Sequence, residues 1–322
     1  MLLTVLICTH DRAPLLHKVL ESLNAALRPE EGVELLVIAN NCSDETHDLL
    51  DDYVQDPAGR IPMRWLAEPQ AGKSYALNFG LPHVRTPLLA FVDDDHRVDQ
   101  NFLVSICRAA ADFPDSALFC GRILPDWDGR EPAWVHEAGP YRIYPLPVPR
   151  FDQGDTGCDL TAERAVPGGG NLFLRTEWVR RIGGFATDMG PSGHDLGGAE
   201  DLDWVLRAMG LGARLRYVPE VVQYHYVDTS RLTLDYLMRK AYKRTASIIR
   251  LHPESHTGSI PRYLYRKIVT YGFKAALSLR TDRRRYYLVR TAAALGEAAG
   301  HIGLRRARPA PGQLSGSDKC SD

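Results

Sequence analysis

Short apolar runs alternate with amphipathic stretches over the first 123 residues. The apolar runs predict strands, and the helical spacing between them predicts helices. The strands are expected at residues 2–9, 33–38, 63–67, 88–92 and 117–123, and the helices at residues 14–27, 43–54 (with Ser43 as N-cap), 72–82 and 101–111. This alternation predicts an α/β fold whose mostly parallel sheet is covered on both faces.

The pattern changes after residue 123. Residues 124–167 are rich in Pro, Gly, Trp and Tyr and lack a clear period. A stretch of that length without regular structure is expected to be functional. Further elements are then expected as a strand at 172–174, a helix from Thr176, a Gly-rich stretch at 184–199, a helix at 200–209 and a strand at 213–218.

From Leu232 onward the pattern is helical and basic. A chain of 322 residues has room for one large domain and an appendage. We therefore expect a catalytic domain at 1–230, a basic helical region at 231–308 and a disordered tail at 309–322.

The composition argues for a cytoplasmic protein. No apolar run reaches about 18 residues, the length that a spanning helix needs. The first nine residues lack the basic start of a signal peptide and are typical of a strand. The six cysteines form no C-x-x-C pair, which favours reduced thiols in the cytosol.

The charge is balanced overall but not along the chain. Residues 231–309 hold 18 Lys and Arg against 4 Asp and Glu, a balance of +14, and residues 310–322 hold a balance of −1. The total of −1 leaves −14 for residues 1–230. The basic segment either contacts an anionic surface, such as the inner face of a membrane, or packs on its own acidic body. We expect no nucleic-acid partner.

Three carboxylates, Asp93, Asp94 and Asp95, directly follow the predicted strand at 88–92. Ligands bind outside the carboxyl ends of strands in an open α/β sheet. Three adjacent carboxylates repel one another unless a cation joins them, and Mg²⁺ or Mn²⁺ bound to phosphate oxygens is the obvious candidate. The alternative is an Asp-rich turn that caps the next helix.

Other polar residues are expected at the same edge of the sheet. Lys73 stands in a Gly-Lys-Ser helix start that lacks the first glycine of a P-loop, so it either contacts a phosphate or ribose or is solvated. Thr9 and Arg12 follow the first strand, at the edge of the expected nucleotide pocket. Arg12 is equally suited to pairing with a surface carboxylate.

Several short motifs occur in a fixed order along residues 2–228. Taken together they make the chain resemble an inverting family 2 glycosyltransferase with the GT-A fold. The motifs are Cys8-Thr9-His10-Asp11-Arg12, Asn40-Asn41-Cys42-Ser43-Asp44-Glu45-Thr46, Glu68-x4-Lys73-Ser74-x2-Leu77-Asn78-x-Gly80, Asp93-Asp94-Asp95, Gly169-Gly170-Asn171, Gly183-Gly184-Phe185 and Gly198-x-Glu200-Asp201.

The resemblance implies metal-dependent transfer of a sugar, hexosyl or related, from a nucleoside diphosphate sugar to an acceptor hydroxyl, with inversion at the anomeric carbon. The metal, Mn²⁺ or Mg²⁺, would neutralise the diphosphate leaving group. By this resemblance Asp94 meets the ribose, Asp95 holds the metal and Asp93 supports the turn or the nucleotide. The nucleotide-sugar pocket would further include Thr9, Arg12, Asn40, Asn41, Lys73, Gly169 and Asn171.

Inversion by single displacement needs one general base, and the resemblance assigns that role to Asp201. Asp201 starts a helix after glycines, where the helix dipole favours an anion. Glu200 would orient the acceptor or a neighbouring basic group. His225 either completes the metal shell or is structural, and it is expected just after the last strand. His96 and His194 are expected to be structural.

Ala39 departs from the family pattern, which often has an Asp that contacts the base in uridine-nucleotide enzymes. Either Asn40 or Asn41 reads the base, or the nucleotide is not UDP. The sequence also leaves open the acceptor, which belongs to a cell-surface polysaccharide, a glycolipid or another lipid-linked molecule, or a small natural product.

Two other classes of function are considered. A nucleotidyltransferase uses a similar sheet and metal but needs a Gly-rich basic loop after the first strand, which residues 8–14 do not offer. A non-catalytic binder of sugar nucleotides has no need for a general base. The presence of Asp94, Asp95 and Asp201 argues against such a binder.

Overall fold

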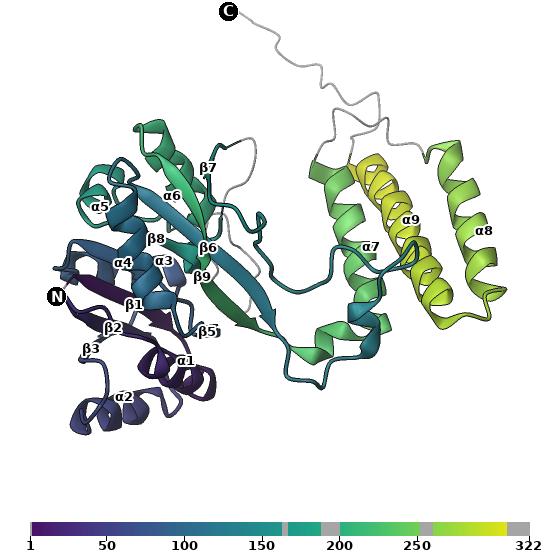
Figure 1. The fold of residues 1–322 in the computed structure, drawn as a ribbon. Coiled ribbons are helices and arrows are strands. Elements are labelled where there is room, and N and C mark those ends of the chain that lie inside the picture. Colours follow the sequence, from purple (N-terminus) through teal and green to yellow (C-terminus); the bar gives the residue numbers. More distant parts are fainter. Residues whose placement is uncertain (1, 163–166, 188–199, 252–259, 308–322) are drawn as a thin grey trace, which may run out of the picture. The chain divides into compact units, whose positions relative to one another are not determined.

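The computed structural model of the chain describes residues 2–162, 167–187, 200–251 and 260–307 (Figure 1). It divides into two compact units. The sheet unit comprises residues 1–126 and 149–227, and the helical unit comprises residues 127–148 and 228–322. His194, Gly198 and the predicted disordered tail at 309–322 lie outside the described residues.

In the part of the sheet unit that the structure describes, a nine-stranded mixed sheet forms the centre, in the order β3-β2-β1-β4-β8-β6-β9-β5 with β7 beside β9. Parallel pairing joins β3, β2, β1 and β4, and it also joins β6 to β9, whereas β5, β7 and β8 run the other way. The predicted α/β fold with a mostly parallel sheet is confirmed. The strands are β1 Leu3–Thr9, β2 Val33–Asn40, β3 Met63–Glu68, β4 Leu88–Phe91, β5 His96–Val98, β6 Leu118–Asp126, β7 Cys158–Leu160, β8 Leu172–Arg175 and β9 Leu215–Tyr226.

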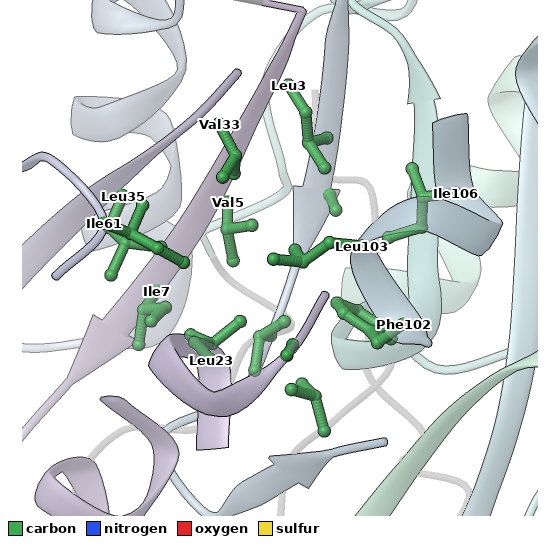
Figure 2. Packing of buried hydrophobic residues seen from close by; sticks show 14 of the residues in the cluster. Leu3, Val5, Ile7, Leu23, Val33, Leu35, Ile61, Phe102, Leu103 and Ile106 are labelled. Atoms are coloured by element: carbon green, nitrogen blue, oxygen red, sulfur yellow. The ribbon is translucent and has the colours of Figure 1, made fainter. Parts of the chain in front are cut away.

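Helices cover both faces of the sheet because successive side chains of a strand point to opposite faces. Leu3, Val5 and Ile7 of β1 enter one core together with helix residues such as Leu23 and Leu103 (Figure 2). Leu6 enters the core on the other face, which contains Trp204. The helices of this unit are α1 Ala13–Ala25, α2 Thr46–Gln55, α3 Lys73–Gly80, α4 Phe102–Asp112, α5 Glu177–Ile182 and α6 Glu200–Gly210, with short 3₁₀ turns at Leu81–His83 and Gly169–Asn171.

The start of α2 differs from the prediction. Ser43 is not its N-cap, because the Ser43 hydroxyl and backbone N–H donate to Asp11. Asp44 instead accepts from the backbone N–H of Thr46 at 3.1 Å and from that of Ala13 at 3.0 Å. One carboxylate therefore satisfies N–H groups in the first turns of both α1 and α2.

The last strand is longer than predicted. The expected strand at 213–218 continues as β9 to Tyr226, so His225 lies within the strand and not after it. The sequence prediction ended the strand before Pro219, because proline has no backbone N–H to donate to a neighbouring strand. The register shifts there, from Cys120 opposite Tyr217 to Arg122 opposite Val222, and this bulge accommodates Pro219.

Among its described residues, the helical unit contains three helices, α7 Leu234–Leu251, α8 Arg262–Ala276 and α9 Thr281–Ala307, with 3₁₀ turns at Ala133–His136 and Thr229–Leu232. α9 packs against both α7 and α8 (Figure 1). A Cβ at Gly296 of α9 would lie 2.1 Å from the Tyr242 carbonyl oxygen, so glycine allows α7 and α9 to approach closely. No helix in the described part of the chain is long and apolar enough to cross a membrane.

Candidate active site

The three aspartates lie at the turn between β4 and β5. β4 ends at Phe91 and β5 begins at His96. Because β1, β2 and β4 are parallel neighbours, their carboxyl ends meet at the same edge of the sheet. Thr9, which is buried, ends β1 at this edge, and Asn40 ends β2.

Asn40 holds the loop that leads to Lys73. Its side-chain oxygen accepts from the Gly72 N–H at 2.8 Å, and its amide nitrogen donates to the Gln70 carbonyl at 2.7 Å and to the Glu68 carbonyl at 3.1 Å. The buried amide is thus fully engaged with backbone. Asn40 positions the start of α3, where Gly72 adopts a φ of 135° that favours glycine.

Lys73 lies between two carboxylates. Its Nζ is 2.8 Å from Asp93 Oδ1 and 3.9 Å from Asp201 Oδ2. Burial alone would lower the pKa of Lys73, but Asp93 and Asp201 raise it well above its usual range. Burial would likewise raise the pKa of Asp93, but Lys73 and His96 lower it. Lys73 is therefore a permanent cation at the centre of the site.

Two consecutive glycines make room for these carboxylates. A Cβ on Gly169 would lie 2.2 Å from Asp201 Oδ1, and a Cβ on Gly170 would lie 2.2 Å from Asp93 Oδ2. Real side chains do not approach so closely, so a Cβ at either position would displace the carboxylate that lies there. Gly168, in contrast, has open space around it.

Arg12 joins the other two aspartates. Its Nη1 donates to Asp94 Oδ1 at 2.9 Å and to Asp95 Oδ2 at 3.1 Å. Burial raises the pKa of Asp94 to about 6, and the charge of Asp95 adds to the effect, although Arg12 opposes it. Arg12 was expected either at the nucleotide pocket or paired with a carboxylate. It pairs with two carboxylates, and both belong to the predicted Asp93–Asp95 site.

His96 and His225 face Asp95 from adjacent strands. They are direct partners in the antiparallel pairing of β5 with β9, and their ring centroids are 4.8 Å apart. Each Nε2 lies 3.8 Å from Asp95 Oδ1. One atom from each of these three residues lies within 4.8 Å of the other two, so the group has the spacing of a metal site.

Hydrogen bonds define the tautomer of both histidines. Gln223 donates from Nε2 to the Gly170 carbonyl at 2.8 Å, which leaves its Oε1 to accept from His96 Nδ1 at 2.8 Å. His225 Nδ1 donates to the Tyr226 carbonyl at 2.6 Å. Both Nε2 atoms therefore carry a lone pair in the neutral ring, and both lie 3.8 Å from Asp95 Oδ1.

Glu200 and Asp201 begin α6. Glu200 is buried, and burial together with the charge of Asp201 raises its pKa. Glu200 Oε2 and Asp201 Oδ1 are buried and accept no hydrogen bond from the described residues. Both oxygens can still accept a hydrogen bond, but neither is accessible to solvent in this structure. A small cavity beside Asp201 is lined by Leu6, Cys8, Lys73, Leu77, Phe91, Val92, Asp93, Gly169, Phe185 and Asp201.

Two of the predicted site residues remain to be described, Asn171 and Asn41. Asn171 is buried, and its side chain bonds both the N–H and the carbonyl of Gly121, at 3.1 and 2.7 Å. It therefore supports β6 through its amide. Asn41 is exposed and adopts a left-handed φ of 50°, with its backbone N–H donated to Glu68.

Three residues beside the predicted site are not among the residues that the sequence predicts for it. His96 was expected to be structural, and Gly170 and Gln223 were given no role. Their parts depend on the register of β5 against β9 and on the turn before β8, which no local pattern reveals. The direct succession of His96 after three aspartates was the one available signal.

Residues 4–182 match the sequence profile of glycosyl transferase family 2. The chain belongs to this family. It is a glycosyltransferase, and the resemblance seen in the motifs is confirmed.

Curated relatives agree with this assignment. The chain is 23% identical over 253 residues to the glucosyl-dolichyl phosphate glucuronosyltransferase of Haloferax volcanii, covering 75% of this chain and 74% of the relative. It is also 23% identical over 253 residues to the succinoglycan biosynthesis protein ExoM of Rhizobium meliloti, covering 78% and 75%. The pre-mycofactocin glycosyltransferase of Mycobacterium tuberculosis is 27% identical over 252 residues, which cover 74% of this chain and 45% of the relative.

Solved structures show the same GT-A fold. TarS of S. aureus superposes with a TM-score of 0.55 at 15% identity, covering 94% of this chain and 55% of TarS. The mannosyltransferase PcManGT of Pyrobaculum calidifontis, solved with GDP-Man and Mn²⁺, gives 0.53 at 17% identity, covering 95% and 75%. TarS residues 1–349 with UDP-GlcNAc give 0.52 at 16% identity, covering 95% and 92%.

Proposed function

We propose that this chain transfers a sugar from a nucleoside diphosphate sugar to an acceptor hydroxyl, with a divalent metal and with inversion at the anomeric carbon. One observation carries the proposal. The Asp93–Asp95 turn, the cation of Lys73 and the unbonded carboxylate oxygen of Asp201 converge at the carboxyl edge of the sheet. This is the arrangement that a charged leaving group and a nucleophilic hydroxyl require.

The residues around Asp95 fit a divalent cation. One nitrogen of each imidazole and one carboxylate oxygen lie within 4.8 Å of one another, a spacing that suits a divalent cation held among them. Nitrogen ligands suit Mn²⁺ better than Mg²⁺, which prefers oxygen and water. We therefore propose Asp95, His96 and His225 as ligands and Mn²⁺ as the preferred metal. A bound metal would neutralise the charge that develops on the diphosphate.

Asp201 is proposed as the general base. Its Oδ2 is 3.9 Å from Lys73 Nζ, and its Oδ1 has no hydrogen-bond partner in the described part of the chain. An ionised carboxylate with a free oxygen can take the proton of an acceptor hydroxyl as that oxygen attacks the sugar. Glu200, buried next to it, is proposed to orient the acceptor.

The donor is proposed to lie against Arg12, Lys73 and Asp94. Arg12 and Lys73 supply positive charge at the edge where a diphosphate would lie, and Asp94 presents a carboxylate suited to ribose hydroxyls. TarS has been solved with UDP and UDP-GlcNAc, and PcManGT with GDP-Man. Because Ala39 is buried at the end of β2 and lacks a polar side chain, the base is proposed to be read at Asn41 and its neighbours.

The acceptor is proposed to be a hydroxyl of a lipid-linked or polysaccharide chain. The name of the Haloferax relative includes a dolichyl phosphate, and that of the Rhizobium relative includes succinoglycan biosynthesis. Both classes of acceptor extend well beyond one sugar. A site at an open sheet edge can admit the end of such a chain.

A thermal-shift screen of nucleoside diphosphates with Mn²⁺ tests the donor site, because a ligand that binds only the native state raises its melting temperature. One nucleoside diphosphate should stabilise the protein more with Mn²⁺ than with chelator. The corresponding sugar nucleotide should then yield a product whose anomeric configuration, measured by NMR, is opposite to that of the donor. A product with the donor's configuration would contradict the single displacement.

A further inference from the structure

The outward face of α8 carries an apolar row where a surface helix ordinarily carries polar groups. Tyr265, Val269, Phe273 and Leu277 follow one another at four-residue intervals and are 57%, 70%, 65% and 64% exposed. Side chains four residues apart lie next to one another on a helix, so the four form one continuous strip, here called the apolar ladder. Large exposed apolar patches mark interaction surfaces.

Packing within the helical unit does not account for the ladder. The opposite side of α8 faces α9, where Leu264 and Ala275 are buried and the Tyr271 ring lies 6.0 Å from that of Tyr287. α8 is therefore held to the unit by one face, and the ladder points away from it.

Positive charge accompanies the ladder. Residues 260–280 contain no Asp or Glu but hold five basic residues, Arg262, Arg266, Lys267, Lys274 and Arg280. At 100° per residue, Arg262 and Arg266 fall within the same arc of about 120° as the ladder. Both are exposed, and neither has an ion-pair partner among the described residues. The face thus combines apolar side chains with uncompensated cations.

We propose that this face of α8 binds the surface of an anionic lipid bilayer. The ladder would enter the boundary between headgroups and acyl chains while the arginines contact lipid phosphates. Both components of the face match such a surface, and no described helix is suited to spanning it. The inference goes beyond the proposed transfer reaction and does not depend on it.

Two other occupants fit less well. Residues 252–259 and 308–322, which lie outside the described residues, contain one leucine between them and so have few side chains to cover the ladder. A second copy of the chain would bring the same cations to the interface, and α8 has no acidic residue to pair with them.

Vesicle flotation tests the proposal. The parent should float with vesicles that mix phosphatidylcholine and phosphatidylglycerol, and binding should weaken as salt shortens the Debye length. The variant V269Q/F273Q/L277Q should bind at least about tenfold more weakly, since it removes the side chains that enter the bilayer. R262Q/R266Q should lose about fivefold for each arginine.

A control variant removes three exposed apolar residues from the sheet unit. Leu27, Val54 and Leu211 are 48%, 45% and 48% exposed, and L27Q/V54Q/L211Q should bind vesicles like the parent. Circular dichroism verifies that each variant keeps its helix content. Hydrolysis of a soluble donor should be unchanged in the ladder variant, which separates membrane binding from the transfer reaction.

Three results would overturn the proposal. The parent could fail to bind anionic vesicles at low salt, or the folded ladder variant could bind them as well as the parent does. Sedimentation could instead show a parent dimer that the ladder variant dissociates, which would assign the face to a second copy. Donor turnover that persists in any of these cases would leave the proposed function standing.

Discussion

At the scale of single residues, the site depends on two glycines without side chains as well as on its charged groups. Gly169 and Gly170 let Asp201 and Asp93 occupy space that any side chain would fill. Lys73 then compensates both carboxylates from a third direction. The account therefore predicts strong effects from substitutions as small as one methyl group.

Gly169→Ala should lower turnover by about 10², the effect expected when a reacting group is misplaced by about 1 Å. Its methyl would lie 2.2 Å from Asp201 Oδ1, so the carboxylate must move. Gly168→Ala is the matched control, because nothing lies within 4 Å of its Cβ and its φ of −76° suits alanine. Steady-state kinetics with a melting curve for each protein provide the comparison. Equal turnover in the two variants would argue against a close fit around Asp201.

Asp201→Asn should leave donor affinity unchanged and lower turnover by about 10²–10⁴, because it removes the base and keeps the shape. Asp203→Asn in the same helix is the control, since Asp203 accepts from Arg207 Nε at 2.8 Å and is not proposed to touch substrate. If Asp203→Asn abolished turnover and Asp201→Asn did not, the base would be Asp203.

At the scale of elements, the sequence predicted most of the fold and missed what depends on pairing between distant strands. The apolar runs located β1 to β4 within a residue or two, because buried parallel strands have a strong local signal. The length of β9 was not predicted because a proline such as Pro219 is a local signal for the end of a strand. The bulge that accommodates Pro219 forms only where β9 pairs with β6. The proximity of His96 to His225 was not predicted for the same reason, since only the pairing of β5 with β9 brings the two opposite each other.

The Asp44 carboxylate links α1 and α2, and its contribution to the free energy of unfolding should depend on pH. Although partial burial raises its pKa, hydrogen bonds from Ala13 and Thr46 lower it below the ordinary value. A lowered pKa means that the ionised form stabilises the fold above about pH 4 and that this stability is lost as the pH falls further. Asp44→Ala should cost about 1 kcal/mol of unfolding free energy at pH 7. Urea titrations should show the difference from the parent shrinking below pH 4, and a difference independent of pH would contradict the assignment.

The contact between α7 and α9 should tolerate no side chain at Gly296. A methyl there would lie 2.1 Å from the Tyr242 carbonyl oxygen and 2.4 Å from Thr245 Oγ1, so Gly296→Ala should separate the helices and lower the melting temperature. Gly272→Ala in α8 is the control, because its Cβ would meet nothing within 4 Å. It should stabilise the protein by about 0.5–1 kcal/mol through helix propensity. Thermal unfolding followed by circular dichroism compares the two, and equal effects would refute the close packing.

At the scale of the whole molecule, the net charge of −1 is the sum of an acidic N-terminal part and a basic C-terminal part. Residues 1–230 carry a balance of −14, yet the described acidic site contains the cations Arg12 and Lys73 and two histidines facing Asp95. The acidic body thus holds positive groups where a diphosphate is proposed to bind, while most of the remaining positive charge lies in the helical unit. The cations at the sheet edge suit the proposed donor site, and those of the helical unit suit the proposed contact with an anionic surface.

Calorimetric titration of the nucleoside diphosphate identified in the screen tests the central claim, a metal-dependent donor site at the end of β4. With Mn²⁺, the parent and the surface control Asp115→Asn should bind, and Asp95→Ala should lose binding while remaining folded. Chelator should reduce the parent to the level of Asp95→Ala. Binding by the parent that is equally tight in Mn²⁺ and in chelator, or binding by Asp95→Ala that matches the parent, would contradict the account.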